Sequence, residues 1–225
     1  MKKYLLILIM ILTACESGPL ENKEPVENKV ENNVNTWTDG VIPYAFEDNV
    51  PQAQKEIILS AMATYESFLN VDYVAYSIED LLKLENGLLI KYTGAVQSSV
   101  YPIGMPEYIS DFRVGDIRWF EEQDALHELG HNLGREHEHQ LANALDYIII
   151  DYDNIADGWE RNYELGETIF NTPFDYNSHM IYGSYDVAKD QSKPVWTDYN
   201  GKTYESSKTL TELDKQKYIE LYGKK

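Results

Sequence analysis

The chain has 225 residues, of which 38 are acidic and 19 are basic, so its formal net charge is −19 at pH 7. A surface this acidic argues against nucleic acid and anionic membrane faces as partners, because both are polyanions. The single cysteine excludes an intramolecular disulfide, so the fold must be held by its core and by any bound metal ion. The length fits one domain of about 190 residues behind an N-terminal segment.

The N-terminus has the pattern of an export signal. Two lysines precede an apolar run, Leu5 to Leu12, which is too short to span a bilayer and has the size of a signal-peptide core. The run leads into Leu12-Thr13-Ala14-Cys15, which resembles the lipobox of bacterial lipoproteins, whose cysteine is lipidated. An ordinary signal peptide with a chance cysteine is the alternative. We expect residues 1–14 to be a signal peptide with a lipobox, and the protein to be exported and anchored through Cys15 to a bacterial membrane, on its periplasmic or cell-surface side.

Residues 15–36 are predicted to be the lipidated cysteine and a flexible tether. The stretch after Cys15 is rich in Glu, Asn, Lys, Val and Pro and has no aromatic residue, so it cannot bury enough apolar surface to fold. We therefore expect the folded domain to span residues 37–225, beginning near Trp37.

Apolar periodicity and turn residues predict the elements of the domain. In its first half we expect strands at 41–46, 71–76, 88–93 and 117–120, a helix from Pro51 to about Asn70, and loops with short strands over 94–115. In its second half we expect helices at 121–133, 153–164 and 211–222, and a short apolar run at 147–150. Strands come first and helices later, which indicates an α+β fold.

The helix expected at 121–133 carries the most informative pattern, because four of the five histidines of the chain lie within residues 127–139. Residues four apart share a helix face, so His127 and His131 can offer two imidazole nitrogens to one metal ion. Glu128 reaches the same space without being a ligand. Gly134 lets the chain leave the helix, so that His137 can return as a third ligand.

Three histidines leave a fourth coordination position for water, which is the arrangement of a catalytic rather than a structural zinc site. Zinc lowers the pKa of such a water towards neutrality, and Glu128 is placed to take its proton. The pattern predicts one catalytic zinc ion and hydrolytic chemistry. A pair of surface histidines on a helix is the alternative for the first two positions alone, but five required residues at fixed offsets disfavour it.

Two stretches together resemble the astacin family of zinc metalloendopeptidases, which belongs to the metzincin clan. Residues 127–138 match HExxHxxGxxHE, and Ser178-His179-Met180-Ile181-Tyr182 matches the family's Met-turn, SxMxY. The resemblance covers about Trp37 to Tyr222. It implies a bilobed domain whose upper lobe holds a mixed sheet and the active-site helix, and whose lower lobe is mostly irregular chain with a C-terminal helix.

The resemblance also implies roles for single residues. His127, His131 and His137 would bind zinc, and Glu128 would be the general base. Tyr182 would be a further, switchable zinc ligand that moves off the metal and donates a hydrogen bond to the oxyanion of the transition state. In addition, Met180 would form an apolar floor under the histidines and Glu138 would be a buried acid beside the third ligand. His139 and His179 do not fit the ligand spacing, so we expect supporting or surface roles for them.

The sequence departs from the family in ways that bear on specificity and activation. Residues 140–145 are nearly uncharged where family members often carry an arginine, and no long propeptide is visible ahead of Trp37. In the family, the matured N-terminus can fold inward towards the glutamate that follows the third histidine. Our hypothesis is that Glu138 is satisfied within the chain and that the tether stays intact.

The predicted activity is hydrolysis of internal peptide bonds by a monomeric, membrane-anchored enzyme whose partners are protein or peptide substrates. The peptide would pair with an edge strand, which we place near residues 117–120. Arg113, Arg118 and Arg135 are candidates for recognising an acidic substrate side chain. Two alternatives are a non-peptidase zinc amide hydrolase and a membrane-anchored binding or adhesion protein with a vestigial metal site.

Overall fold

The protein is described by a computed structural model over residues 34–225, apart from residues 96, 117, 119 and 208. The expected signal peptide, Cys15 and most of the expected tether lie outside the described residues. Val34 to Thr36 belong to the domain, because the Met105 amide donates to the Asn35 carbonyl at 2.7 Å. The chain just ahead of Trp37 is thus bonded to the domain, and the boundary at residue 37 stays a prediction.

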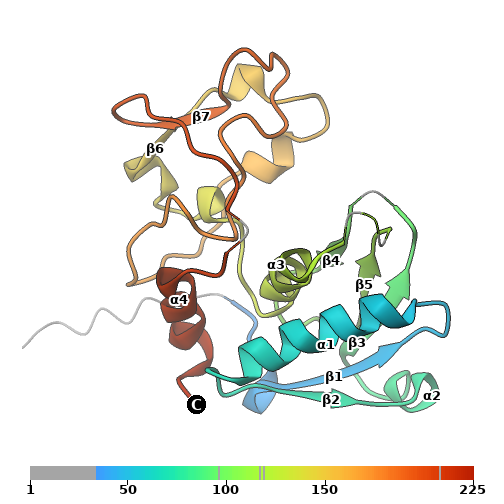
Figure 1. The fold of residues 1–225 in the computed structure, drawn as a ribbon. Helices are drawn as coiled ribbons and strands as arrows, with labels where there is room; N and C mark the ends of the chain where they lie inside the picture. Colours follow the sequence, from blue (N-terminus) through green and yellow to red (C-terminus); the bar gives the residue numbers. More distant parts are fainter. Residues whose placement is uncertain (1–33, 96, 117, 119, 208) are drawn as a thin grey trace, which may run out of the picture.

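A five-stranded sheet forms the N-terminal lobe, called the upper lobe here, which is drawn in blue and green at the bottom of Figure 1. Its order is β2-β1-β3-β5-β4, with the first four strands parallel and β4 antiparallel at the edge. The strands are β1 (Val41–Phe46), β2 (Asp72–Ala75), β3 (Gly87–Tyr92), β4 (Ser99–Tyr101) and β5 (Ile109–Val114). Alternation along β3 sends Leu88 and Ile90 into the main core, whereas Leu89 faces the short helix α2 (Ile78–Leu81).

Two long helices pack on the main-core face of this sheet. Helix α1 (Gln52–Glu66) follows Pro51 and buries Ile58, Ala61, Met62 and Tyr65, which share one face. Helix α3 (Glu122–Asn132) is closed at its start by a reciprocal capping box between Glu121 and Asp124. The Tyr65 hydroxyl donates to the Leu126 carbonyl at 2.8 Å, which ties α1 directly to α3.

The lower lobe, which is drawn in yellow and orange at the top of Figure 1, is mostly irregular chain. Its regular structure is a two-stranded antiparallel sheet, β6 (Ile148–Ile150) with β7 (Trp196–Asp198), and four 3₁₀ segments, Glu138–Gln140, Ala144–Asp146, Tyr152–Asn154 and Glu160–Tyr163. A further 3₁₀ turn, Thr38–Gly40, precedes β1 in the upper lobe. A second apolar core, which includes the fully buried Trp196 and Tyr163, holds the lower lobe together.

Helix α4 (Glu212–Tyr222) joins the two lobes. A capping box between Thr211 and Asp214 starts it, at the position where the sequence predicted a helix. Its Tyr218 is fully buried and packs edge-on against Tyr65 of α1, with ring centroids 5.0 Å apart. Helix α4 also contacts the lower lobe, where its Glu220 side chain accepts hydrogen bonds from the backbone N–H groups of Asn171 and Thr172.

Two expected elements are wrong. Residues 153–164 are not one helix but two short 3₁₀ segments separated by a turn at Gly158, whose φ of +90° no helix accommodates. The strand expected at 117–120 is replaced by a turn at Arg118 and irregular chain at Phe120; Ile117 and Trp119 lie outside the described residues. Over the part of the chain that is described, no helix has both the length and the apolar character that crossing a bilayer requires.

Candidate active site

Helix α3 and the turn after it bring three histidines to one point. The rings of His127 and His131, one turn apart, have centroids 4.8 Å apart. Gly134 leaves the helix with a φ of +96°, and the chain returns so that the His137 ring lies 5.3 Å and 4.7 Å from the other two. One ligand atom from each histidine lies within 4.8 Å of the other two, so the three are positioned to bind a metal ion.

Hydrogen bonds on the far side of each ring fix the tautomer. The Nδ1 of His127 lies 2.8 Å from the His179 carbonyl, and that of His131 lies 2.7 Å from the Arg135 carbonyl. The Nδ1 of His137 lies 2.7 Å from the side-chain oxygen of Gln140. Because these oxygens can only accept, each Nδ1 carries the proton and each Nε2 keeps its lone pair.

Burial keeps the three rings neutral. Desolvation lowers the pKa of His131 to about 3 and moves those of His127 and His137 below their usual range. The Nε2 of His137 is buried and has no hydrogen-bond partner within the described structure. A buried, neutral nitrogen without a partner suits a zinc ion, which binds neutral imidazole.

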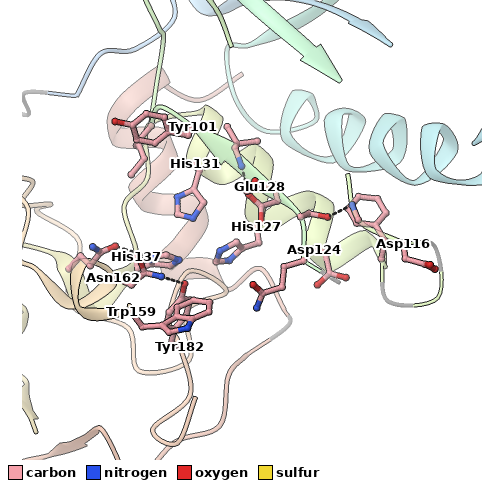
Figure 2. A pocket seen from close by; sticks show the side chains of 18 residues that line it. Tyr101, Asp116, Asp124, His127, Glu128, His131, His137, Trp159, Asn162 and Tyr182 are labelled. Carbon is pink, nitrogen blue, oxygen red and sulfur yellow. Dashed lines mark hydrogen bonds between the residues drawn. The ribbon is translucent and has the colours of Figure 1, made fainter. Parts of the chain in front are cut away.

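Glu128 lines the same cleft, which has a volume of about 630 Å³ (Figure 2). Its Oε2 accepts a hydrogen bond of 2.8 Å from the backbone N–H of Val100, in the edge strand β4. Burial raises the pKa of Glu128 to about 8, although the Val100 bond opposes the shift. A carboxyl group with a pKa near neutrality can both take up and release a proton at physiological pH.

Tyr182 enters the cleft from the lower lobe, with its ring centroid 4.4 Å from that of His137. Its hydroxyl accepts a hydrogen bond of 2.9 Å from the Asn162 side chain, so its own O–H is free to donate (Figure 2). Burial raises the pKa of Tyr182 to about 12, so the group is a neutral donor at pH 7.

Met180 is fully buried beneath α3. A Cβ added at Gly130 would lie 2.9 Å from the Met180 sulfur. Helix α3 can therefore pack this closely against Met180 because residue 130 has no side chain. The resemblance implied an apolar floor under the histidines, and the structure places Met180 against Gly130, between His127 and His131 in the sequence. The Met180 carbonyl also accepts from the Glu138 amide at 2.7 Å, which fixes the loop that carries His137.

The two remaining histidines are buried supports rather than surface residues. The His139 ring stacks on that of His137 at 5.1 Å, and its Nε2 lies 2.8 Å from the Asn162 carbonyl. The backbone carbonyl of His179 accepts the hydrogen bond from His127. The ring Nε2 of His179 lies 3.0 Å from the Tyr218 hydroxyl. Neither belongs to the ligand cluster.

Glu138 is fully buried and is paired within the chain, as our hypothesis requires. Its carboxylate accepts from the Arg135 guanidinium at 2.7 Å, from the Asp175 amide at 2.9 Å, and from the Lys217 ammonium. Arg135 is therefore unavailable to a substrate. Arg118 is paired with Asp116 at 2.9 Å, and Arg113 is exposed beside Asp111 and is not among the residues that line the cleft.

Sequence reasoning missed four residues that shape the site: Val100, Gln140, Asn162 and Lys217. Gln140 follows His137 by three residues, a spacing that a short 3₁₀ turn brings together and that a reader of the sequence could have used. The other three reach the site from distant segments, and no local pattern marks them.

Comparisons with known proteins agree with this geometry. The profile of the Astacin family of peptidases matches residues 29–223. Astacin-like metalloprotease toxin 5 of Loxosceles gaucho is 34% identical over 175 residues, covering 72% of this chain and 85% of the toxin. Astacin-like metalloprotease toxin 1 of Loxosceles intermedia is 33% identical over 190 residues, covering 79% of this chain; the chain spans 64% of that toxin's length.

Solved structures share the fold. High choriolytic enzyme 1, a hatching enzyme zinc-protease from Oryzias latipes, superposes with a TM-score of 0.71 at 20% identity, covering 84% of this chain and 93% of that one. Myroilysin gives a TM-score of 0.60 at 19% identity, covering 84% and 95%. The expected bilobed α+β fold is thereby confirmed. From the matched profile and the relatives above 30% identity, the chain belongs to the astacin family.

Proposed function

We propose that this chain is a zinc-dependent endopeptidase that hydrolyses internal peptide bonds. The observation that carries the proposal is the convergence of three neutral, Nδ1-bonded histidines with the buried Glu128 in one open cleft. Family membership supports the same activity.

His127, His131 and His137 would hold the zinc ion through Nε2. Zinc at this position supplies Lewis-acid polarisation of a carbonyl group and lowers the pKa of a water molecule. Glu128 takes the proton of the attacking water and returns it to the leaving amine. Tyr182 donates its O–H to the developing oxyanion, since Asn162 already occupies the acceptor side of that hydroxyl.

The substrate backbone pairs with β4 rather than with residues 117–120. Strand β4 is at the edge of the sheet, and Ser99, Val100 and Tyr101 line the cleft. The N–H of Val100 points into the cleft, as its bond to Glu128 demonstrates. An extended peptide can therefore add to this edge while its scissile bond lies over the histidines.

Replacement of the base tests the mechanism. We expect Glu128→Ala to keep its fold and its zinc but to lose casein hydrolysis by about 10²- to 10⁴-fold, because proton transfer loses its carrier. Glu122→Ala, on the exposed side of the same helix, is the matched control and should keep full activity. Comparable turnover in the Glu128 variant would refute the role.

The two alternatives are separated by a protein substrate. Zinc-loaded protein should cleave casein or gelatin, and a chelator should abolish the cleavage. A non-peptidase amide hydrolase or an adhesion protein would leave both proteins intact, and that result would overturn the proposal.

We further propose that the protein is exported, anchored through a lipid on Cys15 and monomeric. The signal-like residues 1–14 and the lipobox-like sequence support the anchor. Cys15→Ala should move the protein from the membrane fraction to the soluble fraction. Recovery of the original protein and the variant in the same fraction would argue against lipidation.

A further inference from the structure

Two fully buried cations meet the carboxylate next to the third histidine. Lys217, on α4, donates to Oε1 of Glu138, and Arg135 donates to its Oε2 at 2.7 Å. Both cations and Glu138 have no exposed side-chain surface. Lys217 lies 79 residues after Glu138 in the sequence, so this contact exists only because α4 packs between the lobes.

A second carboxylate completes the group. Asp214, also buried and on α4, lies 3.8 Å from the Arg135 guanidinium and accepts from the backbone N–H of His179 at 3.0 Å. The four side chains, Arg135, Glu138, Asp214 and Lys217, are named the internal charge cluster here. It contains two cations and two anions, so removal of one member leaves a buried charge unbalanced.

Two of the three histidines bond to the backbone of a cluster residue or of its immediate partner. His131 donates to the carbonyl of Arg135 itself. His127 donates to the carbonyl of His179, whose amide is bound by Asp214. The His137 ring itself bonds to Gln140, but the residue adjoins Glu138, whose carboxylate is held by Arg135 and Lys217. The cluster therefore supports the backbone that orients His127 and His131, and the loop that carries His137.

We propose that Lys217 is a positioning residue that completes the zinc site from within the chain. Its ammonium group balances Glu138 and thereby fixes the loop that carries His137 and the Arg135 backbone that orients His131. The expected effect on peptide hydrolysis rests on the proposed function. The expected effect on zinc binding does not, because it requires no substrate.

The first experiment compares full-length variants by zinc affinity and by unfolding of the metal-free protein. Lys217→Met removes the charge and keeps the chain length, and it should weaken zinc binding by about 10- to 100-fold, as loss of a supporting partner typically does. Lys215→Met is the matched control on the same helix, because Lys215 pairs with the exposed Glu212 at the surface. Zinc affinity within twofold of the original in the Lys217 variant would overturn the proposal.

A double variant covers the case in which Lys217→Met fails to fold. Glu138→Gln combined with Lys217→Met removes one charge of each sign, so Arg135 and Asp214 remain balanced. We expect this protein to fold and to bind zinc more tightly than either single variant. Failure of the double variant to improve on both single variants would exclude charge balance as the role of Lys217.

Chemical rescue separates positioning from packing. In Lys217→Ala, ethylammonium ions should restore zinc affinity and casein hydrolysis, whereas potassium chloride at the same ionic strength should not. Equal effects of the two salts would contradict a specific role for the ammonium group. If zinc affinity is restored but casein is never cleaved by any form, the peptidase proposal fails and the positioning role stands.

Discussion

The Gln140 side chain holds the ring of the third histidine, His137, in its orientation. Its Oε1 accepts the Nδ1 proton of His137, and its Nε2 lies 3.2 Å from the Arg161 carbonyl and 3.3 Å from the Glu164 carbonyl. The amide is thus fixed at both ends, and the His137 ring cannot rotate without breaking this hydrogen bond. His127 and His131 are held by backbone carbonyls, so this residue alone offers a side chain for mutation.

We predict that Gln140→Leu weakens zinc binding by about 10- to 100-fold, because the ring of His137 loses the acceptor that fixes its tautomer and orientation. Competition with a chromophoric chelator measures the change in Kd. Gln191→Leu, which removes a single hydrogen bond to a backbone carbonyl elsewhere in the lower lobe, should leave the Kd unchanged. An unchanged Kd in the Gln140 variant would mean that the ring is held by packing alone.

At the scale of the element, α3 depends on a missing side chain. A Cβ at Gly130 would lie 2.3 Å from the Tyr218 hydroxyl and 2.9 Å from the Met180 sulfur. These two groups belong to α4 and to the Met-turn, which are the two segments that support the histidines from below. The glycine in the middle of the motif therefore sets the distance between the active-site helix and its support.

Gly130→Ala should reduce the free energy of unfolding by about 1–3 kcal/mol, the usual range for overpacking a buried site. Denaturant titration of the metal-free protein measures it. Gly201→Ala is a useful comparison: it has open space around it and a φ of +76°, so only backbone strain applies, at about 1 kcal/mol. A Gly130 variant as stable as the original protein would show that α3 can shift without cost.

The elements that local signals define were predicted well. The capping box of α4 and the apolar face of α1 lie within single segments, so their structure follows from neighbouring residues. Strand β7 is only three residues long and too short for any periodicity to be visible. The helix predicted over residues 153–164 was wrong because the composition is compatible with a helix, whereas the backbone turns at Gly158.

At the scale of the whole molecule, the two lobes are joined through a buried carboxylate. Burial raises the pKa of Asp214, but attraction to His179 and Arg135 and the hydrogen bond from Ser178 outweigh it, and the net pKa is below its usual value. A carboxyl group whose pKa is lower in the folded state stabilises the protein above its unfolded pKa, about 3.9 for Asp. That stability is lost as the pH falls through the folded pKa.

We therefore predict that the urea midpoint of the protein falls steeply below about pH 4, and that Asp214→Asn shows a shallower fall from a lower starting value. Unfolding curves between about pH 6 and pH 3 measure both slopes. Asp157→Asn is the control, since its exposed ion pair with Lys189 contributes little to stability. Identical slopes for the original and Asp214→Asn would place the acid sensitivity elsewhere.

The sequence was sufficient for the metal-binding residues but not for what holds them. His127, His131, Gly134 and His137 lie within one short segment, where helix geometry alone dictates which side chains converge. Lys217 and Val100 depend on the packing of α4 and on the sheet order, which no spacing encodes. The hypothesis that Glu138 is satisfied within the chain could be stated from the sequence, yet its partner could not be named.

The long separation between Glu138 and Lys217 also sets an order of events during biosynthesis. The three histidines leave the ribosome together, and the lysine that balances their neighbour follows 79 residues after Glu138. Until it arrives, Glu138 lacks this counterion, so the support that Lys217 gives to the histidine-bearing loop depends on synthesis having reached α4.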